Sequence, residues 1–295
     1  MSVLVLGGTG IDTVVPVAGL PVLGADSARP TGPIHDDVSH TGTCVALALR
    51  ALGVPVALAD TIGDDPAGHR ITSAFADWGI PLHAAVSPAG TRRAVDLMSP
   101  GGGRLSIYDG RDIPGYRLPP EIYEAPLAAA RHAHVTIVDW GRHLLPRLRE
   151  AGCTISTDLH DWDGENPYHL DFALGSDLVF VSGVQLAAGA AERVLADGVA
   201  SHVLVTDGAD GATLHTRAGA RHQPAADPGA PVVDTNGAGD AFAAAFLAAF
   251  LAGGSDEVCL RSAAIAGAFA CTSPVGPGSF IDRPTLRSRG GGDLL

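Results

Sequence analysis

The chain has 295 residues, of which 46% are apolar and 17% charged, enough apolar material for a large buried core and unlike a disordered or coiled-coil protein. All 19 basic residues are arginine. The absence of lysine argues against a Walker-A phosphate loop, a pyridoxal Schiff base and a protein-kinase strand lysine. The formal net charge of −13 argues against a nucleic-acid partner, because phosphate backbones bind basic surfaces.

The sequence indicates a cytoplasmic protein without a membrane anchor. Residues 1–8 lack the basic region of a signal peptide, and the longest apolar run, 241–252, is far shorter than the roughly 20 residues that span a bilayer. The four cysteines form no CxxC pair and are expected to be free thiols in a reducing compartment. They are Cys44, Cys153, Cys259 and Cys271.

Strands are predicted where short apolar runs end at glycine or proline, and helices where apolar residues recur at helical spacing. In chain order the predicted elements are a strand at 3–6, edge strands within 12–40, a helix at 43–52, a strand at 54–60, a helix at 68–78, a β-hairpin at 91–98 and 104–108, a strand at 135–138, a helix at 143–151, strands at 154–158 and 178–181, a helix at 187–196, a strand at 202–206, and helices at 238–251 and 257–272. Residues 287–295 contain three consecutive glycines and are expected to form a loose tail.

This alternation predicts an α/β fold: a doubly wound, mostly parallel sheet with helices on both faces. Two β-rich stretches, roughly 12–40 and 91–110, interrupt the alternation and are expected to form a small β-sheet lid. Ligands should then bind at the carboxyl ends of the parallel strands, beneath the lid.

The most specific signal is the segment Asp234–Asp240, DTNGAGD, followed at once by an apolar helix. Its small residues Gly237, Ala238 and Gly239 allow backbone N–H groups to approach an anion, which the positive end of the helix dipole also attracts. Asp240 lies in the first helical turn beside that anion. A carboxylate placed there is unfavourable unless it accepts a proton from an attacking hydroxyl, so Asp240 is the candidate general base.

The first glycine-rich segment, residues 7–10, does not fit a dinucleotide-binding fingerprint, because Thr13 stands where a further glycine is needed and a Val-Val-Pro sequence follows. Asp12 is the better candidate there. A carboxylate just beyond the first strand can accept hydrogen bonds from substrate hydroxyls. A solvated turn residue is the alternative reading.

The DTNGAGD segment resembles the C-terminal signature of the ribokinase-like (PfkB) family of sugar and nucleoside kinases. Weaker matches follow in the family's order along nearly the whole chain. They are the segments 8–12, 49–53, 62–68, 206–211 and 267–272.

The resemblance implies a kinase domain over residues 1–286 that transfers the γ-phosphoryl group of ATP to a primary hydroxyl of a sugar, nucleoside or polyol. It also implies that ATP binds with Mg²⁺, and it leaves open whether a monovalent cation is needed. Asp240 would be the base, with the backbone of Gly237, Ala238 and Gly239 steadying the phosphoryl group. Asp12 would hold the acceptor, and Thr206, Gly208 and Gly211 would line the nucleotide groove.

The chain departs from the family pattern in two places. In the acceptor loop, the family's Gly-Gly-x-x-x-Asn falls on residues 39–44, where only Gly42, an additional glycine common at that point, is retained. His40, Gly42 and Cys44 are the candidate acceptor contacts, with a solvent-facing loop residue as the alternative for His40. Either the acceptor is not an ordinary furanose, or this loop is built differently. Near the nucleotide, the family's Asn-x-x-Glu, which organises hydrated Mg²⁺, becomes Ser182 and Gln185, and these neutral side chains weaken the support for the metal.

Several alternatives stay open at this point. The chain could be a catalytically retired family member that binds a ligand or partner; Asp240→Asn would distinguish the two, since only an enzyme would lose turnover. The segment 158–163 could hold a metal, although a strand-end Asp158 and a solvated loop fit it better. Arg104, in the lid, is a candidate phosphate contact. Because a lid sheet has open edges, a homodimer through the lid is expected.

Overall fold

The computed structural model describes residues 2–20, 27–100, 103–291 and 294, and these residues form two sheets flanked by helices. The strands are β1 (Ser2–Leu6), β2 (Gly10–Pro16), β3 (His35–Ser39), β4 (Val56–Ile62), β5 (Leu82–Val86), β6 (Arg93–Met98), β7 (Arg104–Asp109), β8 (Ala130–Thr136), β9 (Thr154–Asp158), β10 (Leu178–Ser182), β11 (His202–Thr206), β12 (Ala212–Thr216) and β13 (Gly219–Gln223). The α-helices are α1 (Thr41–Ala51), α2 (Pro66–Trp78), α3 (Pro120–Ala129), α4 (Leu145–Glu150), α5 (Leu170–Gly175), α6 (Ala190–Asp197), α7 (Ala238–Leu251), α8 (Asp256–Ala270) and α9 (Arg283–Gly290).

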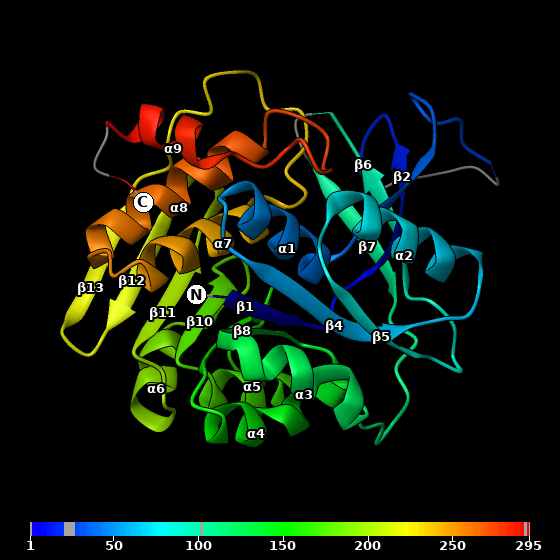
Figure 1. The fold of residues 1–295 in the computed structure, drawn as a ribbon. Coiled ribbons are helices and arrows are strands. Elements are labelled where there is room, and N and C mark those ends of the chain that lie inside the picture. Colours follow the sequence, from blue (N-terminus) through cyan, green and yellow to red (C-terminus); the bar gives the residue numbers. More distant parts are fainter. Residues whose placement is uncertain (1, 21–26, 101–102, 292–293, 295) are drawn as a thin grey trace.

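The large sheet has the strand order β13-β12-β11-β10-β9-β8-β1-β4-β5. From β11 to β5 every neighbouring pair is parallel, and β12 and β13 extend the sheet as an antiparallel hairpin. Helices cover both faces, with α1, α7 and α8 on one side and α3, α4, α5 and α6 on the other (Figure 1). The prediction of a doubly wound α/β fold is therefore confirmed.

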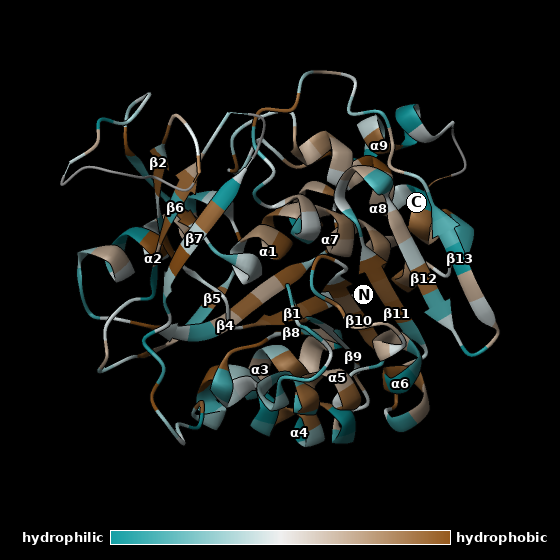
Figure 2. Ribbon diagram, turned by 180° about the vertical axis from the view of Figure 1, so that it is seen from behind, coloured by the Kyte–Doolittle hydropathy of each residue, from teal (hydrophilic) through white to brown (hydrophobic). Residues whose placement is uncertain are grey.

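The side chains of β1 explain how one buried strand supports both layers. Val3 and Val5 belong to the core beneath α1 and α7, whereas Leu4 and Leu6 belong to the core on the α3, α4 and α5 side. This alternation follows from the two-residue period of a strand, and all four side chains are almost fully buried. Figure 2 shows the central strands as hydrophobic, while β13 and α6 carry more hydrophilic residues.

The second sheet lies beside the first and has the order β3-β2-β6-β7. It is built from the two stretches that the sequence predicts as lid, and its β6–β7 pair is the predicted hairpin. The pairing is antiparallel except between β2 and β6, which run parallel. All six residues of β7 are exposed. Residues 21–26 and 101–102, which belong to the predicted lid segments, lie outside the described residues.

The C-terminal prediction is wrong for residues 287–290, which belong to helix α9 rather than a loose tail. The Asp282 carboxylate caps this helix by accepting a hydrogen bond from the backbone N–H of Thr285 at 2.8 Å. Leu286 and Leu294 are 0% and 2% exposed, so burial of apolar side chains holds the segment against the core. Residues 292–293 and 295 of the predicted tail lie outside the described residues.

The cysteines are free, as expected, with Cys271 half-buried and the other three buried. The strand predicted at 135–138 begins earlier in the structure: β8 starts at Ala130 and therefore includes His132 and His134. Among the described residues, no helix is both long enough and apolar enough to cross a membrane.

Candidate active site

The loop before α7 is fixed by a buried carboxylate. Asp234 accepts hydrogen bonds from the backbone N–H of Asn236 at 2.8 Å and of Val275 at 3.3 Å. Gly237 then takes a left-handed conformation, with φ of 76°, as the residue that precedes α7. The loop therefore leads directly into the first turn of α7, whose N–H groups have no partners within the helix and can bind an anion.

The three predicted anion-binding residues differ in how much open space surrounds their backbone. A Cβ at Gly237 would lie 3.0 Å from a methyl group of Val275, whereas the space around Gly239 is open. The N–H of Ala238 donates a long hydrogen bond of 3.3 Å to the carbonyl of Thr235. The backbone of Gly239 is therefore the most accessible of the three to an incoming anion.

Asp240 is half-buried in the first turn of α7. Burial raises the pKa of its carboxyl well above the usual range, and the nearby negative charge of Asp158 raises this pKa further. The Arg104 guanidinium and a hydrogen bond to the Cys44 thiol act in the opposite direction on the same pKa. A carboxylate with a raised pKa is a better proton acceptor for a hydroxyl, as the role of general base requires.

The side chains of Asp12 and His40 are in nearly buried contact on the predicted acceptor side. The side chains are 7% and 6% exposed, and Asp12 Oδ1 lies 2.8 Å from His40 Nε2. Neither atom satisfies the angular requirement of a hydrogen bond, so both keep capacity for another partner. Burial alone would raise the pKa of Asp12, but contact with His40 outweighs this and lowers it. The pair can thus present a carboxylate to acceptor hydroxyls.

The position of His40 depends on a neighbouring glycine. A Cβ at Gly10 would lie 2.5 Å from the imidazole, so only glycine leaves room for the ring. His40 itself has an unusual φ of +74° at the start of α1. Its ring lies 5.3 Å from that of Tyr108 in β7, which brings the lid to the acceptor side of the site.

Gly42 and Cys44 lie in the first turns of α1, and both are buried. A Cβ at Gly42 would lie 1.9 Å from the carbonyl oxygen of Gly7, so this glycine lets α1 pack against the chain after β1. The Cys44 thiol is 2% exposed and lies 3.7 Å from Ser39 Oγ. The structure places Cys44 against Asp240 and assigns Gly42 a packing role.

The predicted nucleotide residues lie at the ends of β10 and β11. Thr206 ends β11, and its carbonyl accepts a hydrogen bond from the N–H of Gly183 at 2.8 Å. Gly208 and Gly211 both have positive φ, and a Cβ at Gly211 would lie 2.2 Å from the carbonyl of Gln223. An open hollow of about 270 Å³ adjoins this turn, bordered by Val205 and by the loop before α6.

Ser182 and Gln185, predicted near the metal, lie at the end of β10 and in the exposed turn after it. The amide nitrogen of Gln185 donates a hydrogen bond to Asp161 at 3.2 Å. Asp161 comes from the loop after β9, two residues beyond Leu159 and three beyond Asp158. A carboxylate therefore accompanies Gln185, although position 185 itself carries no charge.

The lid and the loop before α7 are joined by one side chain. Arg104 of β7 donates a hydrogen bond from Nη1 to the side-chain oxygen of Asn236 at 2.5 Å. The two residues are far apart in the sequence and come from different sheets and layers. The contact brings a guanidinium to the anion-binding loop, close enough to influence the pKa of Asp240.

Sequence reasoning missed a buried ion pair beneath the acceptor side. Arg92, 4% exposed, donates from Nη1 to both carboxylate oxygens of Asp60 at 2.8 and 2.9 Å, and Asp60 is fully buried. Asp60 also accepts a hydrogen bond from the N–H of Thr9. The only available signal was a carboxylate near the end of a predicted strand, because nothing local links two residues so far apart.

Comparison with known proteins places these features in a family. Residues 169–279 match the model of the pfkB family of carbohydrate kinases. The chain is 44% identical over 290 residues to the acarbose 7(IV)-phosphotransferase of an Actinoplanes species, covering 97% of each chain. It is 33% identical over 230 residues to the ATP-dependent ribose-1-phosphate kinase of Halopiger xanaduensis, covering 76% of this chain and 77% of that one.

Solved structures of two kinases are similar to this chain. A microbiome-derived acarbose kinase, Mak1, superimposes with a TM-score of 0.92 at 42% identity, covering 98% of this chain and 99% of that one. The ribokinase of Arabidopsis thaliana, with ribose and ATP, gives a TM-score of 0.80 at 22% identity over 98% of each chain, a likeness of fold.

The chain belongs to the pfkB family of carbohydrate kinases. Its activity is accordingly that of an ATP-dependent phosphotransferase with an alcohol group as acceptor.

Proposed function

We propose that this kinase phosphorylates a hydroxymethyl group on a sugar-like acceptor of the acarbose type, with Asp240 as general base. The observation that carries the proposal is the position of Asp240, half-buried in the first turn of α7 with a raised pKa, directly after the glycine-rich loop. The similarity to two acarbose kinases along the whole chain supports the acceptor class.

In the mechanism that we propose, the acceptor hydroxyl transfers its proton to the carboxylate of Asp240 as its oxygen attacks the γ-phosphorus. The bond between that phosphorus and the β–γ bridging oxygen breaks, and ADP leaves. The backbone N–H groups at Gly237 and Gly239, together with the α7 dipole, stabilise the charge on the transferring group. Asp12, held by His40, orients the acceptor through its hydroxyls.

ATP would bind at the ends of β10 and β11, against Thr206, Gly208 and Gly211, with the adjacent hollow available to the nucleoside. Mg²⁺ bound with ATP neutralises phosphate charge. The residues fit a hydrated ion better than a directly bound one, because Ser182 and Gln185 are neutral while Asp161, against Gln185, can accept hydrogen bonds from metal-bound water. A monovalent cation remains compatible with this arrangement.

The fold and the lid also lead to proposals about context. A reducing cytoplasm supplies ATP and keeps the four free cysteines reduced.

Strand β7 leaves an open sheet edge with exposed Leu105 and Ile107, at 47% and 59%, and pairing with the lid of a second copy would cover it. The strongly acidic composition provides little basic surface for nucleic acid.

The test is ADP formation with Mg-ATP and a panel of acceptors: acarbose, pentoses, hexoses, nucleosides and aminocyclitols. Acarbose or a close analogue should give the highest kcat/KM, with phosphate on a hydroxymethyl group by NMR. Turnover confined to ribose or a nucleoside would overturn the acceptor class. Binding of ATP without turnover of any acceptor would favour the alternative, a retired enzyme that binds ligand alone.

A further inference from the structure

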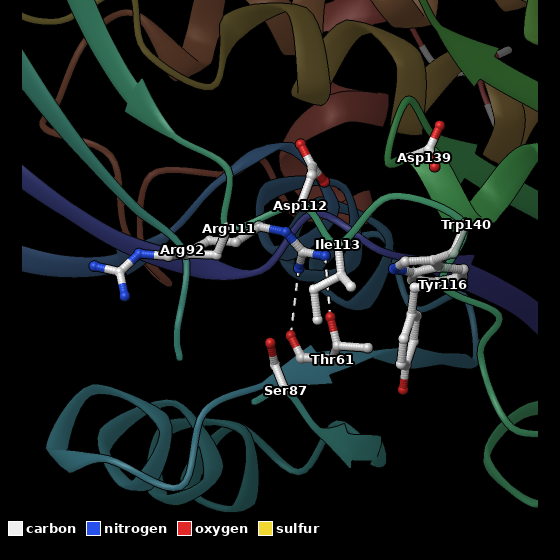
Figure 3. A pocket seen from close by; sticks show the side chains of 9 residues that line it. All are labelled: Thr61, Ser87, Arg92, Arg111, Asp112, Ile113, Tyr116, Asp139 and Trp140. Atoms are coloured by element: carbon white, nitrogen blue, oxygen red, sulfur yellow. Dashed lines mark hydrogen bonds between the residues drawn. The ribbon is translucent and has the colours of Figure 1, made fainter. Parts of the chain in front are cut away.

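A second polar pocket lies beside the acceptor side of the active site, and the proposed chemistry does not use it. It is formed at the ends of β4 and β5, under the segment 110–116, with Asp139 and Trp140 on its far side (Figure 3). Its enclosed part measures about 10 Å³, room for a single water-sized polar group, and its mouth is open.

Two buried donors at this pocket have no hydrogen-bond partner among the described residues. They are Arg92 Nε and Trp140 Nε1, on side chains that are each only 4% exposed. The remaining guanidinium nitrogens of Arg92 are occupied by Asp60 and Thr61, and Figure 3 shows the bonds to Thr61. Buried N–H groups without partners are costly, so the pocket is suited to a group that accepts hydrogen bonds.

The mouth of the pocket has the composition of a carbohydrate site. The carboxylate of Asp112 can accept hydrogen bonds from hydroxyls, and the half-buried ring of Tyr116 offers an apolar face to the C–H groups of a sugar ring. The guanidinium of Arg111 lies at the same rim, held by a hydrogen bond from Nη1 to the carbonyl of Ala89 at 2.8 Å. The rim thus combines a donor, an acceptor and an aromatic surface.

Contacts within the chain link the wall of the pocket to the proposed acceptor residues. The carbonyl of Arg92 accepts a hydrogen bond from the N–H of Ile11 at 3.1 Å, one residue before Asp12. Tyr108 joins the two regions on the lid side. Its ring lies 5.3 Å from that of His40, while its hydroxyl is close enough to the Arg92 guanidinium to interact with it electrostatically.

We infer that this pocket and Tyr108 form an extended acceptor subsite that binds the rings of a multi-ring glycoside beyond the one that is phosphorylated. The reacting ring would lie at Asp12, His40 and Asp240, the next ring against Tyr108, and an oxygen of a further ring would accept hydrogen bonds from Arg92 and Trp140. The inference rests on the proposed function and deepens it, because it names the residues that would bind the rings of the acceptor beyond the one that is phosphorylated.

The test compares acarbose, a multi-ring glycoside, with ribose, a single ring. Trp140→Phe removes the indole N–H and keeps an aromatic ring, and Asp112→Asn removes the rim carboxylate from an exposed position. Their matched controls are Trp78→Phe and Asp77→Asn on α2, away from the site. For each protein, calorimetry gives the Kd for acarbose, and steady-state assays give KM and kcat with both acceptors.

Each of the two site variants should raise the Kd and KM for acarbose about tenfold, the loss of one or two good hydrogen bonds. The values of kcat and the KM for ATP should stay within about twofold, ribose kinetics should not change, and the controls should match the wild type. The inference is overturned if the wild type binds acarbose no more tightly than ribose, or if both site variants keep the wild-type Kd. Variant-sensitive binding of acarbose without its phosphorylation would uphold the inference and overturn the proposed function.

Discussion

Charges of both signs surround the half-buried carboxyl group of Asp240. Asp158, at the end of β9, and Asp12 raise its pKa, while Arg104 from the lid lowers it. The pKa of this carboxyl group is therefore tuned by residues from three separate segments of the chain. Because each neighbour can be neutralised without altering Asp240, the tuning can be measured one charge at a time.

Neutralising these neighbours should move the pH profile in opposite directions. The base acts when deprotonated, so kcat/KM should rise with pH through the pKa of Asp240. Asp158→Asn removes a negative charge, lowers that pKa and should move the acid limb of the kcat/KM profile to lower pH. Arg104→Gln removes a positive charge and should move the limb to higher pH. Identical profiles for both variants and the wild type would contradict the assignment of Asp240 as base.

Replacing Gly42 by alanine should destabilise the folded protein. The Cβ of Gly42→Ala would lie 1.9 Å from the carbonyl oxygen of Gly7, so α1 must shift away from the chain after β1. We expect the free energy of unfolding in urea to fall by about 2–3 kcal/mol, the typical cost of forced overpacking. Gly19→Ala is the control, because no atom lies within 4 Å of its added Cβ, and it should unfold like the wild type.

At the scale of single elements, strand β8 carries two histidines into the core. His132 contacts Thr154 and Ser156 at 2.7 Å each, and His134 contacts Ser156 at 2.8 Å. Burial lowers the pKa of His132 to about 3, and burial lowers that of His134 to about 4. Both imidazoles are thus neutral in the folded protein, and the hydroxyls of β9 satisfy most of their polar atoms.

This pair should make folding sensitive to mild acid. Below pH 6.5 the unfolded chain protonates both histidines while the folded chain does not, so stability falls until the pH reaches the lowered pKa values near 4 and 3. Between these limits each histidine contributes a slope of up to about 1.4 kcal/mol per pH unit. His134→Gln should reduce the loss in unfolding free energy between pH 6.5 and 5. His69→Gln, at an exposed position, should not.

Local sequence patterns predicted some of the helices and strands correctly and missed others. The helix over 238–251 and the strands over 154–158 and 202–206 appear with the predicted bounds. Strands β12 and β13 were missed, since β13 is mostly exposed and has no alternating apolar pattern. The pair Arg92–Asp60 could not be predicted, because it depends on how the lid docks onto β4.

At the scale of the whole molecule, the lid is the part whose surroundings are incomplete in a single chain. Its strand β7 is exposed along its full length, and its sheet ends there. Within the chain, the lid is tied to the main layer by Arg104–Asn236 and by Arg92–Asp60. One side of the lid therefore faces the active site, and the other remains available to a second copy.

A charge on the exposed lid strand should separate the proposed dimer. Ile107→Arg places a guanidinium at a position that is 59% exposed in the single chain, so the monomer should still fold while the paired sheets repel. Light scattering coupled to size exclusion should show a dimer for the wild type and a monomer for the variant. Val199→Arg, at an exposed position between α6 and β11, should remain dimeric. A monomeric wild type would contradict the proposed pairing.

The turnover of Asp240→Asn, which replaces the carboxylate by an amide of the same shape, tests the proposed general base directly. We expect a loss of about 10²–10⁴-fold in kcat with acarbose and Mg-ATP, with ATP affinity unchanged by calorimetry. Asp256→Asn, the equivalent first-turn change in α8, should keep wild-type turnover. An Asp240→Asn variant that turns over at the wild-type rate would contradict the account.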